Sequence, residues 1–434
     1  MGEGMLGAGG QVALILWNNT DERADIKEFY MTTRSRHIYI AGKNDIACRA
    51  LDYLIRGLRY PIDFVKVIPN PEEPERHTWQ YSLSFTARSL GVEIVPISRA
   101  YNDPQALFIS LEYSKIISPH LFASNSLYNI HFSKLPAYRG VGMAIWPILR
   151  GEMESGVTLH RIDAGIDSGE IVDQIVFDLP IEWTARDLYQ AFLDNGFELF
   201  QRNINSLLDN SAISRSQPVV GASYFRRSLL DYSALQVDFR RTAYEVHNQI
   251  RAYSFWEYQL PIIAGRKVLR SALSDRHSSN SPGHVSFDSR NHGFVSTVDW
   301  DVELFFSPYD DLWLWASGDV DDIPDFVSIP DVDRQNAQGW SAAMMAAYHC
   351  RADRLRVLLQ NGIDVNQCNR RGTTLFMYAK SGCEKCGDMS CLKLLLSKGV
   401  NVNAIDAMGK NVIDYLEIEG RDDLVKFILG GVDE

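Results

Sequence analysis

Three polar side chains in the middle of the sequence have the types and spacing needed for acyl transfer. Asn129 and His131 stand two residues apart in an apolar run, 127–132, that predicts a β-strand, so their side chains point to the same face. Asp167 lies in a glycine-punctuated loop, 163–169, after a second predicted strand. An amide can stabilise an oxyanion, an imidazole can accept or relay a proton, and a carboxylate can orient the imidazole. We therefore interpret Asn129, His131 and Asp167 as candidate catalytic groups.

The elements that must position these groups alternate between strands and helices. Short apolar runs predict strands at residues 38–41, 63–68, 92–97, 106–111, 127–132 and 157–162. Helical spacing of apolar residues predicts helices over about residues 46–55, 77–90 and 184–208. Asn44 or Asp45 is the expected N-cap of the first helix, and Gly91 is expected to end the second. This alternation predicts an α/β fold with a mainly parallel, Rossmann-like sheet and a site at the carboxyl ends of its strands.

At 434 residues the chain exceeds one ordinary domain, and its pattern divides it into five segments. Residues 1–30 are interpreted as an extension outside the fold, the alternative being an extra edge strand from Val12 to Trp17. The expected segments after it are the α/β domain (31–215), a middle subdomain with a helix near 238–253 and a β-rich part (216–318), an acidic, proline-punctuated linker (319–332) and a repeat block (333–434).

The repeat block is recognised by two separate anchors. Similar motifs begin at Gly339, Gly372 and Gly409, at spacings of 33 and 37 residues. The segment 358–366 matches 395–403, again 37 residues apart. Both the period and the motifs resemble ankyrin repeats, which are all-α. We expect about three stacked repeats, the last of which is a degenerate cap.

Composition excludes several classes of protein. A net charge of −12 argues against nucleic acid as the main partner, because nucleic-acid-binding domains usually carry basic patches. No apolar run approaches the roughly 20 residues that a membrane span requires, so a cytoplasmic protein without membrane contact is expected. The loose trio of Cys383, Cys386 and Cys391 falls short of the usual four zinc ligands, so free thiols and no metal site are expected.

The motifs around the candidate catalytic groups resemble those of formyltransferases that use 10-formyltetrahydrofolate. Residues 129–136 match the N-I-H-x-S-x-L-P motif, which Tyr138-Arg139-Gly140 continues. Residues 156–169 resemble the G-V-T…D-x-G-x-D-[TS]-G segment. The resemblance extends from about residue 37 to about residue 306. It implies an enzyme whose catalytic trio is Asn129, His131 and Asp167.

The resemblance also implies where the folate donor binds. The pterin ring would lie between the loop Tyr113–Ile117, with Lys115 and Ile117, and the loop formed by Asp163, Ala164 and Gly165. Most contacts there would come from the backbone. Lys115 either reaches the glutamate tail of the donor or is an ordinary surface lysine.

Members of this family formylate initiator methionyl-tRNA, glycinamide ribonucleotide or nucleotide-linked amino sugars. The acidic charge disfavours tRNA, and the more than 200 residues beyond the catalytic region disfavour glycinamide ribonucleotide. Lys43 and Asn44 either contact a substrate diphosphate or simply begin a helix. Tyr224 either stacks on a pyrimidine base or packs in the core, and Arg226 is a candidate phosphate contact.

A formyltransferase with C-terminal ankyrin repeats resembles the bacterial enzymes that formylate dTDP-3-amino-3,6-dideoxy-D-glucose for O-antigen (lipopolysaccharide) synthesis. No motif fixes the position of the amine, so dTDP-4-amino-4,6-dideoxyglucose is the alternative acceptor, and methionyl-tRNA is the least favoured. The repeats bind either a protein or a second nucleotide sugar, with Trp340 as a candidate contact. The resemblance also implies a homodimer through the β-rich region. In a competing hypothesis the formyltransferase fold is inactive and the repeats only bind proteins, but the intact trio favours the enzyme.

Overall fold

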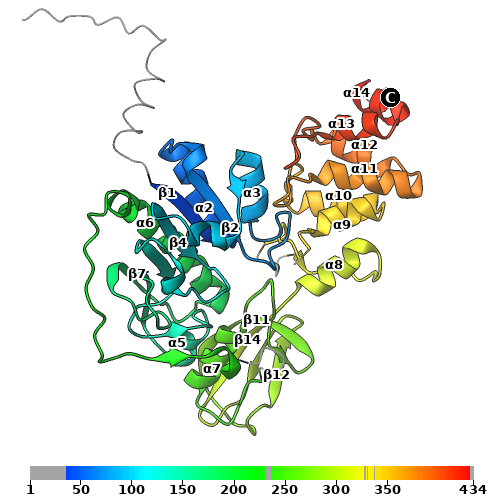
Figure 1. The fold of residues 1–434 in the computed structure, drawn as a ribbon. Helices are drawn as coiled ribbons and strands as arrows, with labels where there is room; N and C mark the ends of the chain where they lie inside the picture. The colour runs from blue at the N-terminus through cyan, green and yellow to red at the C-terminus, as the bar shows by residue number, and fades with distance from the viewer. Residues whose placement is uncertain (1–35, 231–235, 327–328, 330, 337, 431–434) are drawn as a thin grey trace, which may run out of the picture.

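The computed structural model describes residues 36–230, 236–326, 329, 331–336 and 338–430. Figure 1 shows an α/β domain, a smaller β-rich part and a stack of short helices at the C-terminal end. The extension at 1–30 and the alternative strand from Val12 to Trp17 lie outside the described residues. Among the residues that are described, no helix combines the length and apolar character needed to cross a membrane.

A seven-stranded sheet forms the centre of the α/β domain. Its strands are β1 (His37–Gly42), β2 (Val65–Pro69), β3 (Glu93–Ile94), β4 (Ala106–Leu111), β5 (Leu127–His131), β7 (Glu154–Arg161) and β8 (Ile171–Asp178), in the order β3-β2-β1-β4-β5-β7-β8. The first five strands in this order pair in parallel, whereas β7 is antiparallel to both of its neighbours. The mainly parallel α/β fold predicted from the sequence is therefore confirmed.

The helices of this domain are α2 (Asn44–Asp52), α3 (Leu83–Leu90), α4 (Ile97–Tyr101), α5 (Trp146–Leu149) and α6 (Ala185–Leu208). Gly91 ends α3 with a left-handed φ of 73°, as predicted, and Thr184 begins α6 with a capping box. The predicted N-cap of α2 is wrong, because Asn44 has a φ of 62° and lies inside the helix, so Lys43 is the cap. The predicted start of α3 at residue 77 is also wrong, because Ser82 accepts the N–H of Phe85 and caps the helix there.

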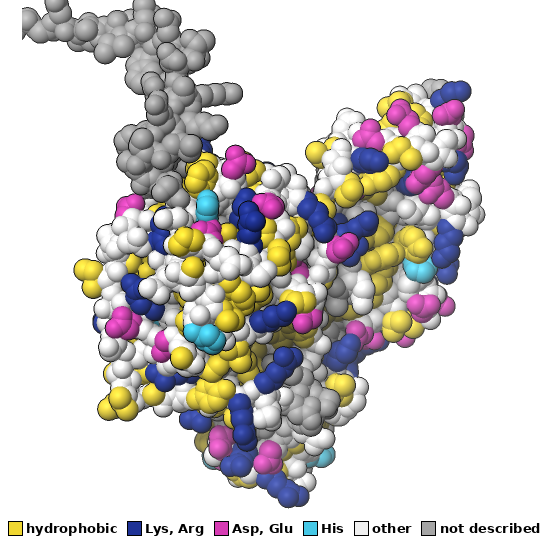
Figure 2. Space-filling view, viewed as in Figure 1, with side chains coloured by type: hydrophobic (Ala, Val, Ile, Leu, Met, Phe, Trp, Pro, Cys, Tyr) yellow, Lys and Arg dark blue, Asp and Glu magenta, His cyan; other side chains and the backbone are white. Residues whose placement is uncertain are grey.

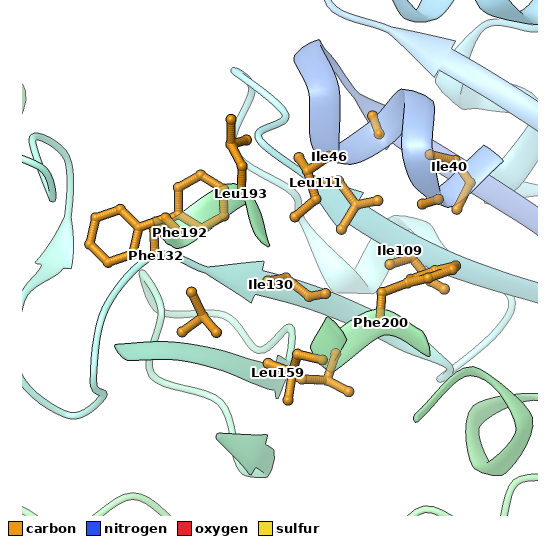
Figure 3. Close-up of a cluster of buried hydrophobic side chains, with 14 of the residues drawn as sticks. Ile40, Ile46, Ile109, Leu111, Ile130, Phe132, Leu159, Phe192, Leu193 and Phe200 are labelled. Carbon is orange, nitrogen blue, oxygen red and sulfur yellow. The ribbon is translucent and has the colours of Figure 1, made fainter. Parts of the chain in front are cut away.

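The apolar core of this domain lies between one face of the sheet and α6. Ile130 and Leu159 point from the sheet toward Phe192, Leu193 and Phe200 of α6, and all five are almost fully buried (Figure 3). Side chains alternate along a strand, so Asn129 and His131 point to the opposite face. The packing of Ile130 therefore fixes the direction in which the candidate catalytic side chains point.

The middle part contains a five-stranded antiparallel sheet covered by a helix. Its strands are β10 (Ile262–Ile263), β11 (Arg266–His277), β12 (Val285–Ser289), β13 (His292–Val295) and β14 (Trp300–Phe306), and the helix is α7 (Ala243–Tyr253). A capping box between Thr242 and Glu245 begins α7, five residues later than the sequence predicted. This is the β-rich subdomain expected from the sequence.

The C-terminal part is all-α, as the ankyrin repeats predict. Its helices are α8 (Tyr309–Ser317), α9 (Ala342–Tyr348), α10 (Ala352–Gln360), α11 (Leu375–Cys386), α12 (Ser390–Ser397), α13 (Val412–Ile418) and α14 (Asp422–Leu429). Tyr309, Leu312 and Trp315 of α8 share the apolar core of the repeats, so this helix packs with them although it precedes the linker.

The cysteines of the repeats differ from expectation. Cys350, after α9, and Cys386, at the end of α11, form a disulfide, so the expected free thiol at Cys386 is wrong. The residues inserted in the second repeat extend α11 and bring Cys386 beside the α9–α10 turn. Cys383 and Cys391 are buried free thiols. Within the described ranges, no group of three side chains is arranged to hold a metal ion.

The repeats contact the α/β domain beside its first helix. The guanidinium of Arg370 lies 2.9 Å from Oδ1 of Asp45, in the first turn of α2. The Nε atom of Arg371 donates to the carbonyl oxygen of His77 at 2.8 Å. The repeats are thus joined by charged contacts to the end of the sheet where β1 passes into α2.

Candidate active site

The structure brings together the three residues that the sequence singled out. Asn129 Nδ2 lies 3.5 Å from Oδ1 of Asp167, and His131 Nδ1 lies 3.6 Å from Oδ2 of the same carboxylate. Asn129 and His131 share one face of β5, and Asp167 comes from the loop between β7 and β8. An amide, an imidazole and a carboxylate therefore converge on that face.

The route by which Asp167 reaches this position differs from the prediction. The loop between the two predicted strands was expected to bring Asp167 to the same end of the sheet as Asn129 and His131. Because β7 runs antiparallel to β5, with Arg161 opposite Tyr128, the loop starts at the amino end of β5 and crosses its face. Asp167 therefore lies beside Asn129 and His131 as expected, on a loop that follows an antiparallel strand.

Backbone contacts hold the loop of Asp167 in place. Asp167 has a left-handed φ of 52°, and its Oδ2 atom accepts the backbone N–H of Gly140 at 2.9 Å. The amide of Gln217 donates to the carbonyl oxygens of Asp167 and Gly169, at 2.8 and 2.7 Å. A Cβ at Gly169 would lie 1.8 Å from the carbonyl oxygen of Arg161, so only glycine fits there.

His131 is held in one tautomer by its surroundings. Its Nε2 atom lies 2.8 Å from the carbonyl oxygen of Tyr138, which can only accept, so Nε2 carries the hydrogen. Burial lowers the pKa of His131 more than the charge of Asp167 raises it. The ring is therefore neutral at neutral pH, with an unprotonated Nδ1 that can accept a proton.

Asp167 is the matching anion. Burial by itself would raise the pKa of this carboxyl group, but the interactions with His131 and His160 and the N–H of Gly140 outweigh it. The net pKa of Asp167 is well below its ordinary range. The carboxylate is therefore charged at physiological pH and can stabilise His131 once that ring gains a proton.

The sequence interpretation missed His160. This residue lies on β7 directly opposite Asn129, and its Nε2 atom is 3.1 Å from Asn129 Nδ2. Only 2% of its surface is exposed. Thr158 and His160 are two residues apart, so the sequence alone indicates that they share one face of their strand. The antiparallel register that pairs His160 with Asn129 cannot be read from the sequence.

Glu112, at the carboxyl end of β4, was missed as well. It accepts hydrogen bonds from the hydroxyl of Tyr189 at 2.9 Å and from Asn44 Nδ2 at 3.3 Å. Burial raises the pKa of Glu112. Positive φ values occur at Asn44, Glu112, Tyr138 and Asp167, which all lie around this edge of the sheet. Such backbone conformations are rare for residues other than glycine and cluster at functional sites.

The two loops expected to hold the folate donor lie on the same face of the sheet as the trio. Tyr113 and Ile117 pack against the same apolar cluster as Ile162, which directly precedes Asp163. This cluster includes Leu127, which shares the face of Asn129 on β5. Lys115 is exposed, and Oδ1 of Asp163 accepts the N–H of Gly165 across Ala164 at 3.1 Å.

The residues expected to meet the nucleotide sugar are placed as follows. Lys43 follows β1 directly, and Asn44 Nδ2 donates to Glu112 and to the hydroxyl of Tyr189. Tyr224 is 56% exposed, so the core-packing alternative for this ring is wrong. Arg226 is exposed and directly follows the short strand β9 (Tyr224–Phe225).

The strand β9 pairs with β6 (Arg139–Gly140), which supplies the N–H that binds Asp167. Tyr224 is therefore one strand away from the loop contact that holds Asp167.

Trp340 lies at the start of the repeats rather than near the trio. Its ring packs edge-on against Tyr348 and Tyr378, with centroid distances of 5.0 and 4.6 Å. It lines a cavity of about 330 Å³ that also includes Arg76 and His77 of the α/β domain.

Known proteins match both parts of the chain. Residues 89–204 match the formyl transferase family, and residues 314–406 match ankyrin repeats in three copies. The crystal structure of WlaRD, described as a sugar 3N-formyl transferase in the presence of dTDP and 5-N-formyl-THF, is 40% identical. The match covers 62% of this chain and 97% of that chain, with a TM-score of 0.59.

Two further relatives are informative. The N-formyltransferase from Helicobacter canadensis, in complex with folinic acid and dTDP-3-aminofucose, is 37% identical over 63% of this chain and 100% of that chain, with a TM-score of 0.59. Methionyl-tRNA formyltransferase from Synechococcus sp. (strain JA-3-3Ab) is 29% identical over 59% of this chain and 85% of its own length.

The domain is a mainly parallel α/β fold in which an amide, an imidazole and a carboxylate meet over one face of a strand. Together with the match to the formyl transferase family, this defines an enzyme that transfers formyl groups. The chain belongs to the formyltransferase family, and ankyrin repeats follow its catalytic and β-rich parts. The family resemblance seen in the sequence motifs is thus confirmed.

Proposed function

We propose that this enzyme moves a formyl group from 10-formyltetrahydrofolate to the amine of a dTDP-linked amino-dideoxy sugar, with dTDP-3-amino-3,6-dideoxy-D-glucose as the acceptor. The observation that carries this proposal is the 40% identity to a sugar 3N-formyl transferase across 97% of that protein. The second solved relative was crystallised with a dTDP-3-amino sugar. The methionyl-tRNA enzyme is less similar, at 29% identity.

The chemistry can be carried by the three converging side chains. The acceptor amine forms a bond to the formyl carbon, and the formyl oxygen becomes an oxyanion that the amide N–H of Asn129 stabilises. Nδ1 of His131 takes the proton that the amine loses, and Asp167 stabilises the imidazolium. The bond from the carbon to N10 of the folate then breaks, and the proton passes to that nitrogen.

The donor site is proposed on the face shared by the two loops. Both similar solved structures contain a formylated folate. In this chain, the loop of Lys115 and Ile117 and the loop from Asp163 through Ala164 to Gly165 rest on the same apolar cluster. We assign the pterin to the space between these loops and the glutamate tail to Lys115. No metal takes part in this scheme.

The nucleotide site is proposed beside β6 and β9. Tyr224 offers an exposed ring for stacking on the thymine, and Arg226 offers a charge for phosphate. Lys43 at the end of β1 is assigned to the diphosphate. The amide of Asn44 is already engaged by Glu112 and Tyr189, so it would contact the substrate through its oxygen or its backbone.

A substrate panel tests this function. We expect tetrahydrofolate to form with dTDP-3-amino-3,6-dideoxy-D-glucose, more slowly with dTDP-4-amino-4,6-dideoxyglucose, and not with methionyl-tRNA. Faster turnover of the 4-amino sugar would show that the acceptor amine is at position 4 of the sugar. The rate with dTDP-3-aminofucose tests which sugar stereochemistry the enzyme prefers. If the folded protein formylates no amino sugar, the interaction-protein alternative replaces the enzyme.

The product of this reaction would be a formamido sugar on dTDP. We propose that it is made in the cytoplasm as a precursor of O-antigen, part of lipopolysaccharide. Analysis of O-antigen composition after deletion of the gene would test this, and an unchanged composition would contradict it.

We propose that the cavity at Trp340 binds a second nucleotide sugar. Its lining combines five Phe, Tyr and Trp rings with Arg76, Arg371 and Lys380. Figure 2 shows Lys and Arg side chains where the α/β domain meets the repeats. Aromatic and cationic side chains together suit a base and a diphosphate. The alternative is the protein-binding role that ankyrin repeats commonly have.

Calorimetric stoichiometry distinguishes these two roles. We expect two dTDP-sugar molecules for each wild-type chain and one for Trp340→Ala, while turnover at low substrate still occurs. One molecule for both chains would exclude the second sugar site. A lowered stoichiometry in Tyr224→Ala but not in Trp340→Ala would assign the binding to the catalytic domain alone.

A homodimer through the middle subdomain is proposed from the exposed apolar side chains of its sheet. Leu273, Phe287 and Phe305 are 43%, 49% and 39% exposed. Exposed apolar side chains on one sheet often mark a protein interface. Sedimentation of the wild type and of Phe305→Lys should give a dimer and a monomer, and a monomeric wild type would contradict the proposal.

A further inference from the structure

We propose that His160 is a positioning residue, which holds the amide of Asn129 in the one orientation that presents an N–H to the formyl oxygen. The proposal rests on the proposed role of Asn129 as the oxyanion donor. It comes from the contacts of His160, which is buried on β7 opposite Asn129 and falls at an unspecified position of the segment 156–169, between its two groups of matched residues.

The backbone fixes the tautomer of His160. Its Nδ1 atom lies 2.7 Å from the carbonyl oxygen of Arg161, and a carbonyl oxygen can only accept a hydrogen bond. Nδ1 therefore carries the hydrogen, and in the neutral ring Nε2 is left as an acceptor. The next residue in the chain thus determines which atom His160 presents to the active site.

This acceptor fixes the orientation of the Asn129 amide. Nε2 of His160 lies 3.1 Å from Nδ2 of Asn129, within hydrogen-bonding distance. The NH₂ group must face His160, because the amide oxygen would repel the lone pair on Nε2. If Nε2 carried a hydrogen instead, the amide would turn over and would direct its oxygen, rather than an N–H, toward the trio.

The second N–H of Asn129 is then available for the reaction. It faces Oδ1 of Asp167 at 3.5 Å, which is longer than an ordinary N–H···O hydrogen bond. An incoming oxyanion can replace this weak contact without breaking the shorter bond to His160. His160 also lies 3.6 Å from Oδ1 of Asp167, and its ring centroid is 6.4 Å from that of His131. The ring therefore contacts Asp167 as well as Asn129.

The arrangement predicts a specific pattern in a double-mutant cycle. His160→Leu removes the acceptor and should lower kcat about tenfold or more, but by less than the roughly 100- to 1000-fold expected for losing the donor. KM for the folate and the sugar should change by less than about twofold. In Asn129→Ala the amide is already absent, so adding His160→Leu should change kcat no further. His160→Gln, which keeps an acceptor oxygen, should recover part of the loss.

His247 provides a matched control. It is also 2% exposed, and its ring nitrogens lie 2.8 Å from the hydroxyl of Ser271 and 2.9 Å from the carbonyl oxygen of Ile181, in the contact between α7 and its surroundings. His247→Leu should lower the melting temperature without the selective loss of kcat. Equal losses of kcat in folded His247→Leu and His160→Leu would mean that the effect is only structural.

A spectroscopic measurement keeps the test independent of how the variants fold. In the full chain labelled with [15N]histidine, the His160 ring should show a protonated Nδ1 and an unprotonated Nε2, and the resonance is assigned by its absence in His160→Gln. The opposite tautomer would overturn the proposal. Multiplicative losses in the double mutant, or normal kcat in His160→Leu, would also overturn it. If Asn129→Ala itself kept normal kcat, the proposed role of Asn129 would fail first.

Discussion

The Nδ1 atom of His131 lies 3.6 Å from Oδ2 of Asp167, and the same oxygen accepts the backbone N–H of Gly140 at 2.9 Å. The base and its anion are thus held by different parts of the backbone, one on a strand and the other by a turn. Neither needs the substrate to find its place. This arrangement supports a site that is organised before the substrates bind.

Removal of the amide at Asn129 is expected to act on turnover and not on binding. In Asn129→Ala, kcat should fall roughly 100- to 1000-fold, because one donor to the oxyanion is lost. The dissociation constants of dTDP-sugar and folate, measured by calorimetry, should be nearly unchanged. Asn203→Ala removes an amide that donates to Asp173 away from the trio, and it should keep wild-type kcat. Similar turnover in the two variants would rule out the donor role.

The acid limit of activity should follow the titration of His131. A neutral ring accepts a proton, and burial lowers its pKa, so activity should be constant through neutral pH and should fall only below the lowered pKa. In Asp167→Asn the anion that raises this pKa is lost, so His131 should titrate at a still lower pH. Histidine NMR measures this directly, apart from the titration of the substrate amine. A shift to higher pH in Asp167→Asn would contradict the electrostatic role of the carboxylate.

Gly169 should tolerate no side chain. A Cβ there would lie 1.8 Å from the carbonyl oxygen of Arg161, so Gly169→Ala must displace the loop that carries Asp167. We expect a loss of about 1–3 kcal/mol in the free energy of unfolding, together with a loss of kcat. Gly399→Ala, at a φ of 75° with open space around it, should cost about 1 kcal/mol and leave kcat unchanged. Wild-type stability and turnover in Gly169→Ala would show that the loop can move freely.

The ion pair between Arg370 and Asp45 should fasten the repeats to the catalytic domain. Asp45 is largely buried, and the guanidinium of Arg370 also lies 4.9 Å from the ring centroid of Tyr81. Arg370→Met should lower the unfolding free energy by about 1–3 kcal/mol and speed hydrogen exchange at the start of α2. The exposed pair of Arg241 and Asp238 is the comparison, and Arg241→Met should cost less than about 1 kcal/mol. Equal effects would mean that the contact between the domains contributes little.

The sequence determined the features that depend on local order. Residues two apart on a strand share a face, so Asn129 and His131 could be paired from the sequence, and the glycines around Asp167 indicated a constrained loop. The apolar periods predicted the alternating strands and helices, and the repeat spacing predicted the ankyrin block. Each of these is a relation between residues close in the chain, or between copies of one motif.

Only the tertiary structure decided which distant residues meet. The antiparallel direction of β7 places His160 opposite Asn129 and sends the Asp167 loop across the sheet face. The longer α11 places Cys386 where it forms a disulfide with Cys350. Glu112 has a left-handed backbone and accepts hydrogen bonds from Tyr189 and Asn44. Strand direction, register and helix packing are set by the burial of side chains from the whole domain. No local pattern contains that information, so the trio was visible in the sequence and the residue that orients its amide was not.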